Sequence, residues 1–193
     1  MLVNELFYSL QGEGYHAGTP AVFVRFAGCN LGCPFCDTDH SAGTDMTTDE
    51  IVAEVGRYPA RLVVLTGGEP ALQLTDDLVD ALHRAGKRVA VETNGTCRLP
   101  KNIDWITLSP KDAFVGPSAA PVLRRADEIK VVFDGEHEPC SYPGIEAAHH
   151  FVQPCDTGDA RRNAELTRQA VDFCLANPDW RLSLQIHKIL DIK

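Results

Sequence analysis

Three cysteines stand close together in the first quarter of the chain, and their spacing limits what can form around them. Cys29, Cys33 and Cys36 follow the pattern C-x3-C-x2-C, so three thiolates can face one metal centre. Iron–sulfur clusters are held by cysteine thiolates, normally four, so three leave one iron open to another ligand. The alternative is a structural zinc site with His40 as the fourth ligand. The spacing favours a cluster but leaves zinc open.

The composition argues against nonspecific nucleic-acid binding and against a membrane protein. The net charge of −9 lacks the excess of Lys and Arg that neutralises phosphates. No run approaches the roughly 18 apolar residues of a membrane helix, and no signal peptide is recognisable, so we expect a cytoplasmic protein. Clustered cysteines in that compartment are more often metal sites than disulfides. The 193 residues suit one domain, expected to span residues 1–193.

Apolar runs alternate with amphipathic segments along the chain. Strands are expected at 3–10, 21–27, 62–66, 88–92, 105–108, 128–133, 150–153 and 182–186, and helices at 47–57, 74–85 and 161–175. Thr47 and Glu50 form the capping box that begins the first helix. Alternating strands and helices imply a mostly parallel α/β sheet. Because a complete (β/α)8 barrel typically needs about 250 residues, we expect an abbreviated, partly open barrel.

A glycine-rich motif, Thr66-Gly-Gly-Glu-Pro70, follows the expected strand at 62–66. Two glycines let a backbone approach a ligand closely, although alone they are more simply a turn between a strand and a helix. Ligands in such folds bind beyond the carboxyl ends of the strands, and every polar motif in this chain follows a strand. We therefore expect one shared site. A zinc knuckle would need neither this loop nor a barrel.

Together these motifs resemble the radical S-adenosylmethionine (SAM) superfamily, and within it the 7-carboxy-7-deazaguanine synthase family. The superfamily signature is CxxxCxxC with an aromatic residue, here Phe35, before the third cysteine. The family resemblance rests on segments that cover nearly the whole chain: Leu10-Gln-Gly-Glu-Gly14, Arg25-Phe-Ala-Gly-Cys29, Cys36-Asp-Thr-Asp39, Thr66-Gly-Gly-Glu-Pro70, Glu92-Thr-Asn-Gly95, Ser109-Pro-Lys111, Phe151-Val-Gln-Pro154 and Ser183-Leu-Gln-Ile-His-Lys188.

The resemblance implies a radical enzyme of queuosine and deazapurine biosynthesis. Such an enzyme converts 6-carboxy-5,6,7,8-tetrahydropterin into 7-carboxy-7-deazaguanine with ring contraction and release of ammonia, which makes it a carbon–nitrogen lyase. A [4Fe-4S] cluster on Cys29, Cys33 and Cys36 would bind SAM, which is used catalytically. The cofactor radical would do the chemistry, so no side chain is expected to be catalytic. The expected partners are the pterin, a one-electron donor such as flavodoxin, and a second copy in a homodimer.

The resemblance also implies a magnesium ion held by the hydroxyl of Thr38. Magnesium commonly keeps waters and takes few protein ligands, so one hydroxyl plus the substrate carboxylate is chemically reasonable.

Side-chain chemistry suggests how the pterin would be recognised. Gln11 and Glu13 offer acceptors and a donor that match a pterin edge, although a polar turn explains Glu13 equally well. Arg25 lies in an otherwise apolar strand, where an unpaired guanidinium is costly. It needs an anion, either the substrate carboxylate or an internal salt-bridge partner.

The resemblance adds Thr66 and His187 to the substrate side and lets the terminal carboxylate at Lys193 meet the pterin. The alternative for His187 is a histidine of the core or of a dimer interface. The expected substrate-binding residues are Leu10, Gln11, Gly12, Glu13, Arg25, Thr66, His187 and Lys193.

The expected SAM site lies around the ends of the later strands. The segment that contains Gly68 would hold the methionine amino group, while Ser109 and Lys111 suit the ribose and the methionine carboxylate. Glu92 is a further ribose candidate, and the segment from Gln153 would border the adenine. The expected SAM-binding residues are Phe35, Cys36, Asp37, Gly68, Glu92, Ser109, Pro110, Lys111, Gln153, Pro154, Cys155 and Asp156.

Two other functions remain open. A glycyl-radical-enzyme activase would keep the cluster but act on a large protein, and such activases lack the segments around Gln11 and Gln185. A non-enzymatic zinc-binding interaction module would use the cysteines without iron.

Overall fold

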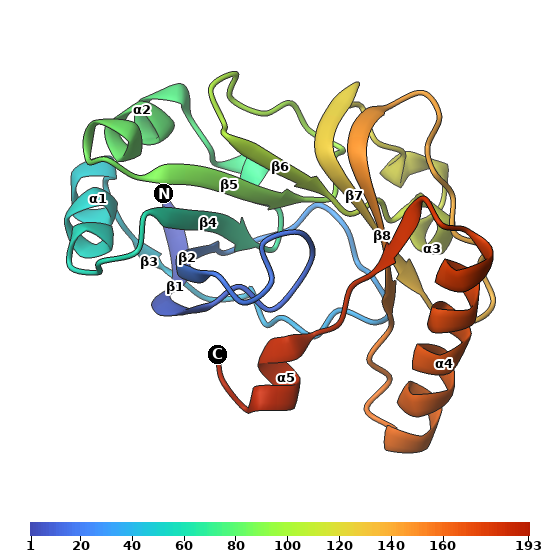
Figure 1. The fold of residues 1–193 in the computed structure, drawn as a ribbon. Helices are drawn as coiled ribbons and strands as arrows, with labels where there is room; N and C mark the ends of the chain where they lie inside the picture. The colour runs from blue at the N-terminus through green and yellow to red at the C-terminus, as the bar shows by residue number, and fades with distance from the viewer.

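Nine strands form one mostly parallel sheet in the computed structural model, which describes residues 1–193 (Figure 1). The strands are β1 (Leu2–Leu10), β2 (Pro20–Phe26), β3 (Thr44–Asp45), β4 (Leu62–Gly67), β5 (Arg88–Thr93), β6 (Trp105–Leu108), β7 (Arg125–Phe133), β8 (Glu146–Pro154) and β9 (Trp180–Leu182). Their order is β3-β1-β2-β4-β5-β6-β7-β8-β9. All neighbours from β2 to β9 are parallel. The sheet does not close, which confirms the predicted partly open barrel.

Three longer helices cover the sheet: α1 (Thr48–Gly56), α2 (Asp76–Arg84) and α4 (Ala160–Ala176). Shorter helical elements are η1 (Pro70–Leu72), α3 (Asp112–Val115), η2 (Pro117–Ala119) and α5 (Ile186–Leu190). The predicted capping box is present, since the Glu50 N–H donates to Thr47 Oγ1 at 3.3 Å and the Thr47 N–H donates to the Glu50 carboxylate at 2.8 Å. The three long helices stand where the sequence predicted them. None of the helices combines the length and the apolar character needed to cross a membrane.

Alternation along the strands decides which side chains can form a site. In β2, Val22, Val24 and Phe26 belong to the largest core cluster, which also includes apolar residues of α1 and α2. Phe23 lies on the opposite face. Because side chains alternate between faces, Arg25 shares the face of Phe23. The parallel register places Arg25 beside Thr66 of β4, so this face becomes polar where the strands end.

The direction of β1 differs from the expectation that all polar motifs meet at one edge of the sheet. β1 is antiparallel to β2, and Leu10 pairs with Pro20 at the beginning of β2. β1 therefore ends beside the beginning of β2, at the end of the sheet opposite the site. The following loop, blue in Figure 1, returns over the inner face, where the Tyr15 N–H donates to the Glu128 carboxylate at 2.8 Å. Gln11 and Glu13 reach the site along this loop.

The end of the chain also differs from the prediction of a strand at 182–186. Strand β9 already ends at Leu182, and the Ser183 N–H makes one further hydrogen bond to the Val152 carbonyl at 2.9 Å. The chain then leaves the sheet, because the Ile186 N–H donates to the Gly12 carbonyl at 3.0 Å. Residues 186–190 form α5, a helix that begins where the sequence predicted the last residue of a strand.

Candidate functional site

A cavity of about 300 Å³ lies between the strand ends, the 11–13 loop, the cysteine loop and α5. All the residues predicted to bind substrate, SAM or metal line it, except Pro110. Pro110 is buried between the lining residues Ser109 and Lys111. The polar lining residues outside the predicted set are His40, Thr93, Asn94, Lys130 and Gln185. The structure thus brings together motifs that lie up to about 180 residues apart in sequence.

The three cysteines of the signature lie on the loop that follows β2, and all three line the cavity. They are free thiols, and burial raises the pKa of Cys29 and Cys33. The Cys36 thiol donates to the Thr38 carbonyl at 3.6 Å. No three Cys, His, Asp or Glu side chains converge as a set of metal ligands in this arrangement, His40 included.

The glycine-rich loop after β4 packs directly on the cysteine loop. A Cβ added to Gly68 would lie 1.9 Å from the Gly28 carbonyl oxygen, and the Glu69 N–H donates to that same oxygen at 2.9 Å. The contact therefore requires a glycine. Three soft thiol donors on a cavity wall, with a backbone that approaches without side chains, fit an iron–sulfur cluster and its ligand.

Glu69 is fully buried and connects two loops of the site. Its carboxylate accepts hydrogen bonds from the Ala71 N–H at 2.9 Å, from Thr93 Oγ1 at 2.7 Å and from the Asn94 N–H at 2.7 Å. Burial raises its pKa, although these three donors oppose the shift. The Asn94 amide donates to the side chain of Asn30 at 3.1 Å, which extends the network to the cysteine loop.

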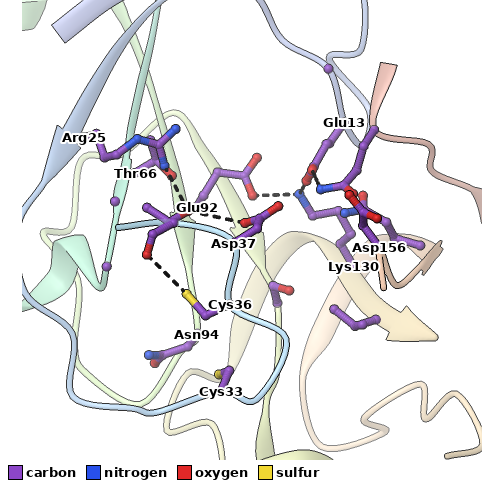
Figure 2. Close-up of a pocket in the computed structure, with 18 of the residues that line it drawn as sticks. Glu13, Arg25, Cys33, Cys36, Asp37, Thr66, Glu92, Asn94, Lys130 and Asp156 are labelled. Carbon is purple, nitrogen blue, oxygen red and sulfur yellow. Dashed lines mark hydrogen bonds and ion pairs between the residues drawn. The ribbon is translucent and has the colours of Figure 1, made fainter. Parts of the chain in front are cut away.

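Lys130, on β7, is a buried cation at the centre of a charged network (Figure 2). Its Nζ lies 2.5 Å from Glu13 Oε2 and 2.8 Å from Glu92 Oε2. Gln185 donates to Glu13 and Gln11 donates to Glu92, both at 3.0 Å. Burial alone would raise the pKa of Glu13, but Lys130 and the hydrogen bonds lower it to about 2. Glu92, expected near the SAM ribose, thus lies in contact with Gln11 of the expected substrate group.

Arg25 has the internal salt bridge that was the alternative to a substrate carboxylate. Its Nε lies 3.0 Å from Glu5 Oε1, and the other oxygen of Glu5 lies 2.9 Å from Lys193 Nζ. Burial would raise the pKa of Glu5, but these two cations lower it. A second nitrogen of Arg25 lies 3.5 Å from Thr38 Oγ1. The guanidinium therefore stands between Glu5 and the predicted magnesium ligand.

Helix α5 connects three parts of the cavity wall. Lys188 Nζ lies 2.7 Å from the carboxylates of both Asp37 and Asp156, so it ties the cysteine loop to the loop after β8. A Cβ on Gly12 would lie 2.2 Å from Nδ1 of His187, which places the histidine directly against the 11–13 loop. Ser9 Oγ donates to the main-chain oxygen of Lys193 at 2.5 Å.

Lys111 follows β6 and lies among the expected cofactor residues. Its Nζ donates to the carbonyl and the hydroxyl of Ser109 at 2.7 and 2.6 Å. Burial lowers the pKa of Lys111 to about 8, and the nearby Cys33 opposes this shift. Both groups line the cavity on the side of the cysteine loop.

Comparison with known proteins gives consistent matches. Residues 23–113 match the model of the radical SAM superfamily. A 7-carboxy-7-deazaguanine synthase of Bacteroides thetaiotaomicron is 55% identical over 99% of this chain and 98% of its own. The enzyme of the same name from Bordetella pertussis is 46% identical over 98% of each chain. The crystal structure of QueE from Escherichia coli superposes with a TM-score of 0.75 at 28% identity, covering 96% of this chain and 94% of that one.

Proposed function

The chain belongs to the 7-carboxy-7-deazaguanine synthase family of radical SAM enzymes, and we propose that it converts 6-carboxy-5,6,7,8-tetrahydropterin into 7-carboxy-7-deazaguanine. The reaction contracts the pyrazine ring and releases ammonia, as a step of queuosine and deazapurine biosynthesis. The observation that carries this proposal is the single cavity on which the family motifs converge, from Gln11 to His187.

Two cofactors follow from membership in the radical SAM superfamily. We place a [4Fe-4S] cluster on Cys29, Cys33 and Cys36, with SAM between the cysteine loop and the strand ends. When bound, these groups supply a 5′-deoxyadenosyl radical, and the protein positions them and excludes water. The backbone at Gly68 would face the methionine amino group. Lys111 would face the methionine carboxylate, an interaction that would stabilise its ammonium form.

The substrate carboxylate would lie near Arg25 and Thr38. Their side chains approach to 3.5 Å, so one carboxylate can meet both the guanidinium and a magnesium ion held by Thr38. Arg25 would then be shared between Glu5 and the substrate. Gln11 and Glu13 would bind the pyrimidine edge, and His187 and the Lys193 carboxylate would close the pocket.

The remaining partners are proposed from the family. A one-electron donor such as flavodoxin would reduce the cluster, and the enzyme would work as a homodimer. All seven cysteines are free, which suits the reducing cytoplasm, where we place the protein.

The decisive experiment is anaerobic incubation of the reconstituted protein with the pterin, SAM and a reductant. We expect 7-carboxy-7-deazaguanine and ammonia in equal amounts, without stoichiometric loss of SAM. A brown protein that cleaves SAM but leaves the pterin unchanged would instead favour a glycyl-radical-enzyme activase. A colourless preparation that contains zinc, without iron or sulfide, would favour the interaction module.

A further inference from the structure

Lys130 is a buried cation to which the family resemblance assigns no role. It is 3% exposed, although lysines are almost never fully buried unless they are paired. Desolvation of an ammonium costs several kcal/mol in order of magnitude, and close anionic partners must offset that cost. Lys130 has two such partners, Glu13 and Glu92, which come from different elements of the fold.

The two carboxylates carry two negative charges against the single positive charge of Lys130, so the three groups together have a net charge of −1. Both carboxylates contact the same Nζ, so their oxygens lie within a few ångströms of each other. Other charged groups act on the same network: Glu128 on β7, and Lys111 after β6. Without the ammonium between them, Glu13 and Glu92 would repel each other, and burial would raise the pKa of Glu13 with no cation to oppose it.

We infer that Lys130 is a positioning residue of the substrate site: it holds the carboxylates of Glu13 and Glu92 side by side and ionised, so that both accept N–H donors from the substrate. The inference rests on the proposed function. It assigns Glu92 to the substrate rather than to the SAM ribose, because Gln11 donates directly to Glu92.

The chemistry of the substrate explains why two ionised carboxylates are useful. The pyrimidine edge of a pterin carries adjacent N–H donors, and a carboxylate only accepts hydrogen bonds. A protonated carboxyl turns one of its two oxygens into a donor and so offers fewer acceptors to these N–H groups. The ionised pair therefore selects a ring with a guanidine-like edge, and it does so only while Lys130 stabilises both charges.

The test compares Lys130→Met, Lys130→Arg and the double variant Lys130→Met/Glu92→Gln with the wild type, as reconstituted holoenzymes with SAM. Lys101→Met, an exposed lysine, is the matched control. The pterin dissociation constant is measured by anaerobic equilibrium dialysis between pH 6 and 9, and SAM affinity is measured alongside. Each variant's dissociation constant is divided by that of the wild type at the same pH, which removes the effect of the pterin's own titration.

We expect Lys130→Met to bind the pterin at least about 10-fold more weakly at pH 6, because truncating one partner of a buried charge pair is costly. The loss should shrink toward pH 9, where Glu13 ionises again. Lys130→Arg keeps the cation and should follow the wild-type pH profile. The double variant restores the net charge of −1, so its ratio to the wild type should change much less with pH than the ratio of Lys130→Met. SAM affinity should change much less than pterin affinity in all of them.

Three results would overturn the inference. Lys130→Met could bind the pterin like the wild type at every pH, the double variant could keep the pH dependence, or SAM and pterin affinity could fall together. If Lys130→Met does not retain the cluster, Lys130→Arg decides, because it keeps the cation and must then show the pH profile of the wild type. A wild-type enzyme that does not bind the pterin would instead refute the proposed function, and the inference with it.

Discussion

The backbone N–H of Asn94 donates a 2.7 Å hydrogen bond to the buried carboxylate of Glu69. This contact fixes the loop after β5 against the loop after β4, which in turn packs on the cysteine loop. The glutamate of the glycine-rich motif is therefore part of the scaffold that holds three loops of the site together, and it does not reach into the cavity.

Replacing Glu69 should destabilise the fold. Glu69→Ala removes the acceptor of two backbone N–H groups and one hydroxyl, and each buried unsatisfied donor costs about 1–3 kcal/mol. We expect a loss of about 2–4 kcal/mol in the free energy of unfolding, measured by urea denaturation. Glu69→Gln keeps a carbonyl acceptor and should lose less. Equal stability of Glu69→Ala and the wild type would remove this carboxylate from the scaffold.

The cysteine assignment predicts a clear division between the three signature thiols and thiols elsewhere in the chain. Single Ala variants of Cys29, Cys33 and Cys36 should lose the brown chromophore and the iron, because each removes one thiolate ligand. Cys140 and Cys174 lie outside the cavity lining, so their Ala variants are matched controls and should keep full iron and sulfide content. A control that loses the cluster would require a different ligand set.

The magnesium prediction rests on one hydroxyl. Thr38→Ala should raise the magnesium concentration for half-maximal rate by about 10–100-fold, while Thr38→Ser keeps the oxygen and should stay close to the wild type. Cleavage of SAM without product formation should survive in Thr38→Ala. Identical magnesium dependence of Ala, Ser and wild type would exclude Thr38 as a ligand.

The raised pKa of the buried Glu128 carboxyl should make the free energy of unfolding depend on pH. Glu128 is 2% exposed, and burial raises its pKa from 4.5 to about 7. Between these values the folded protein binds a proton that the unfolded chain has released, so rising pH favours unfolding, and the effect ends above the folded pKa. Glu128→Gln should reduce the loss of unfolding free energy from pH 5 to pH 8 by on the order of 2 kcal/mol. Urea denaturation of cluster-free protein at both pH values would measure it, and parallel profiles for variant and wild type would contradict it.

Local pattern was enough to predict most of the fold. The continuous apolar run at 62–66 and the Thr47 capping box gave elements at the expected positions, because alternation, propensity and capping act over a few residues. The sequence did not predict the antiparallel direction of β1, since a run of apolar residues carries no information on strand direction. The C-terminal helix was missed for a related reason: the contact between Ile186 and Gly12, which draws the chain off the sheet, joins distant segments.

The candidate site, like the fold, could be predicted only in part. Motifs that follow parallel strands meet at one edge, so their convergence could be expected from topology. Lys130 was missed although it is, like Arg25, a charge in a mostly apolar strand, because that strand carries no motif and its partner Glu13 is distant in sequence. The Arg25–Glu5 ion pair depends on the antiparallel register of β1 and β2, so only the structure could show that Arg25 has an internal partner.

Residues at opposite ends of this sequence complete the cavity, since Gln185 and Ile186 bind the 11–13 loop directly. During synthesis the strands from β1 to β8 emerge first, and domains generally fold as their chain becomes available. The pocket, however, has no finished wall until Lys193, the last lining residue, has left the ribosome. A nascent chain can therefore expose its three cysteines well before it can enclose a ligand beside them, so a delivery system for iron and sulfide would meet an open site.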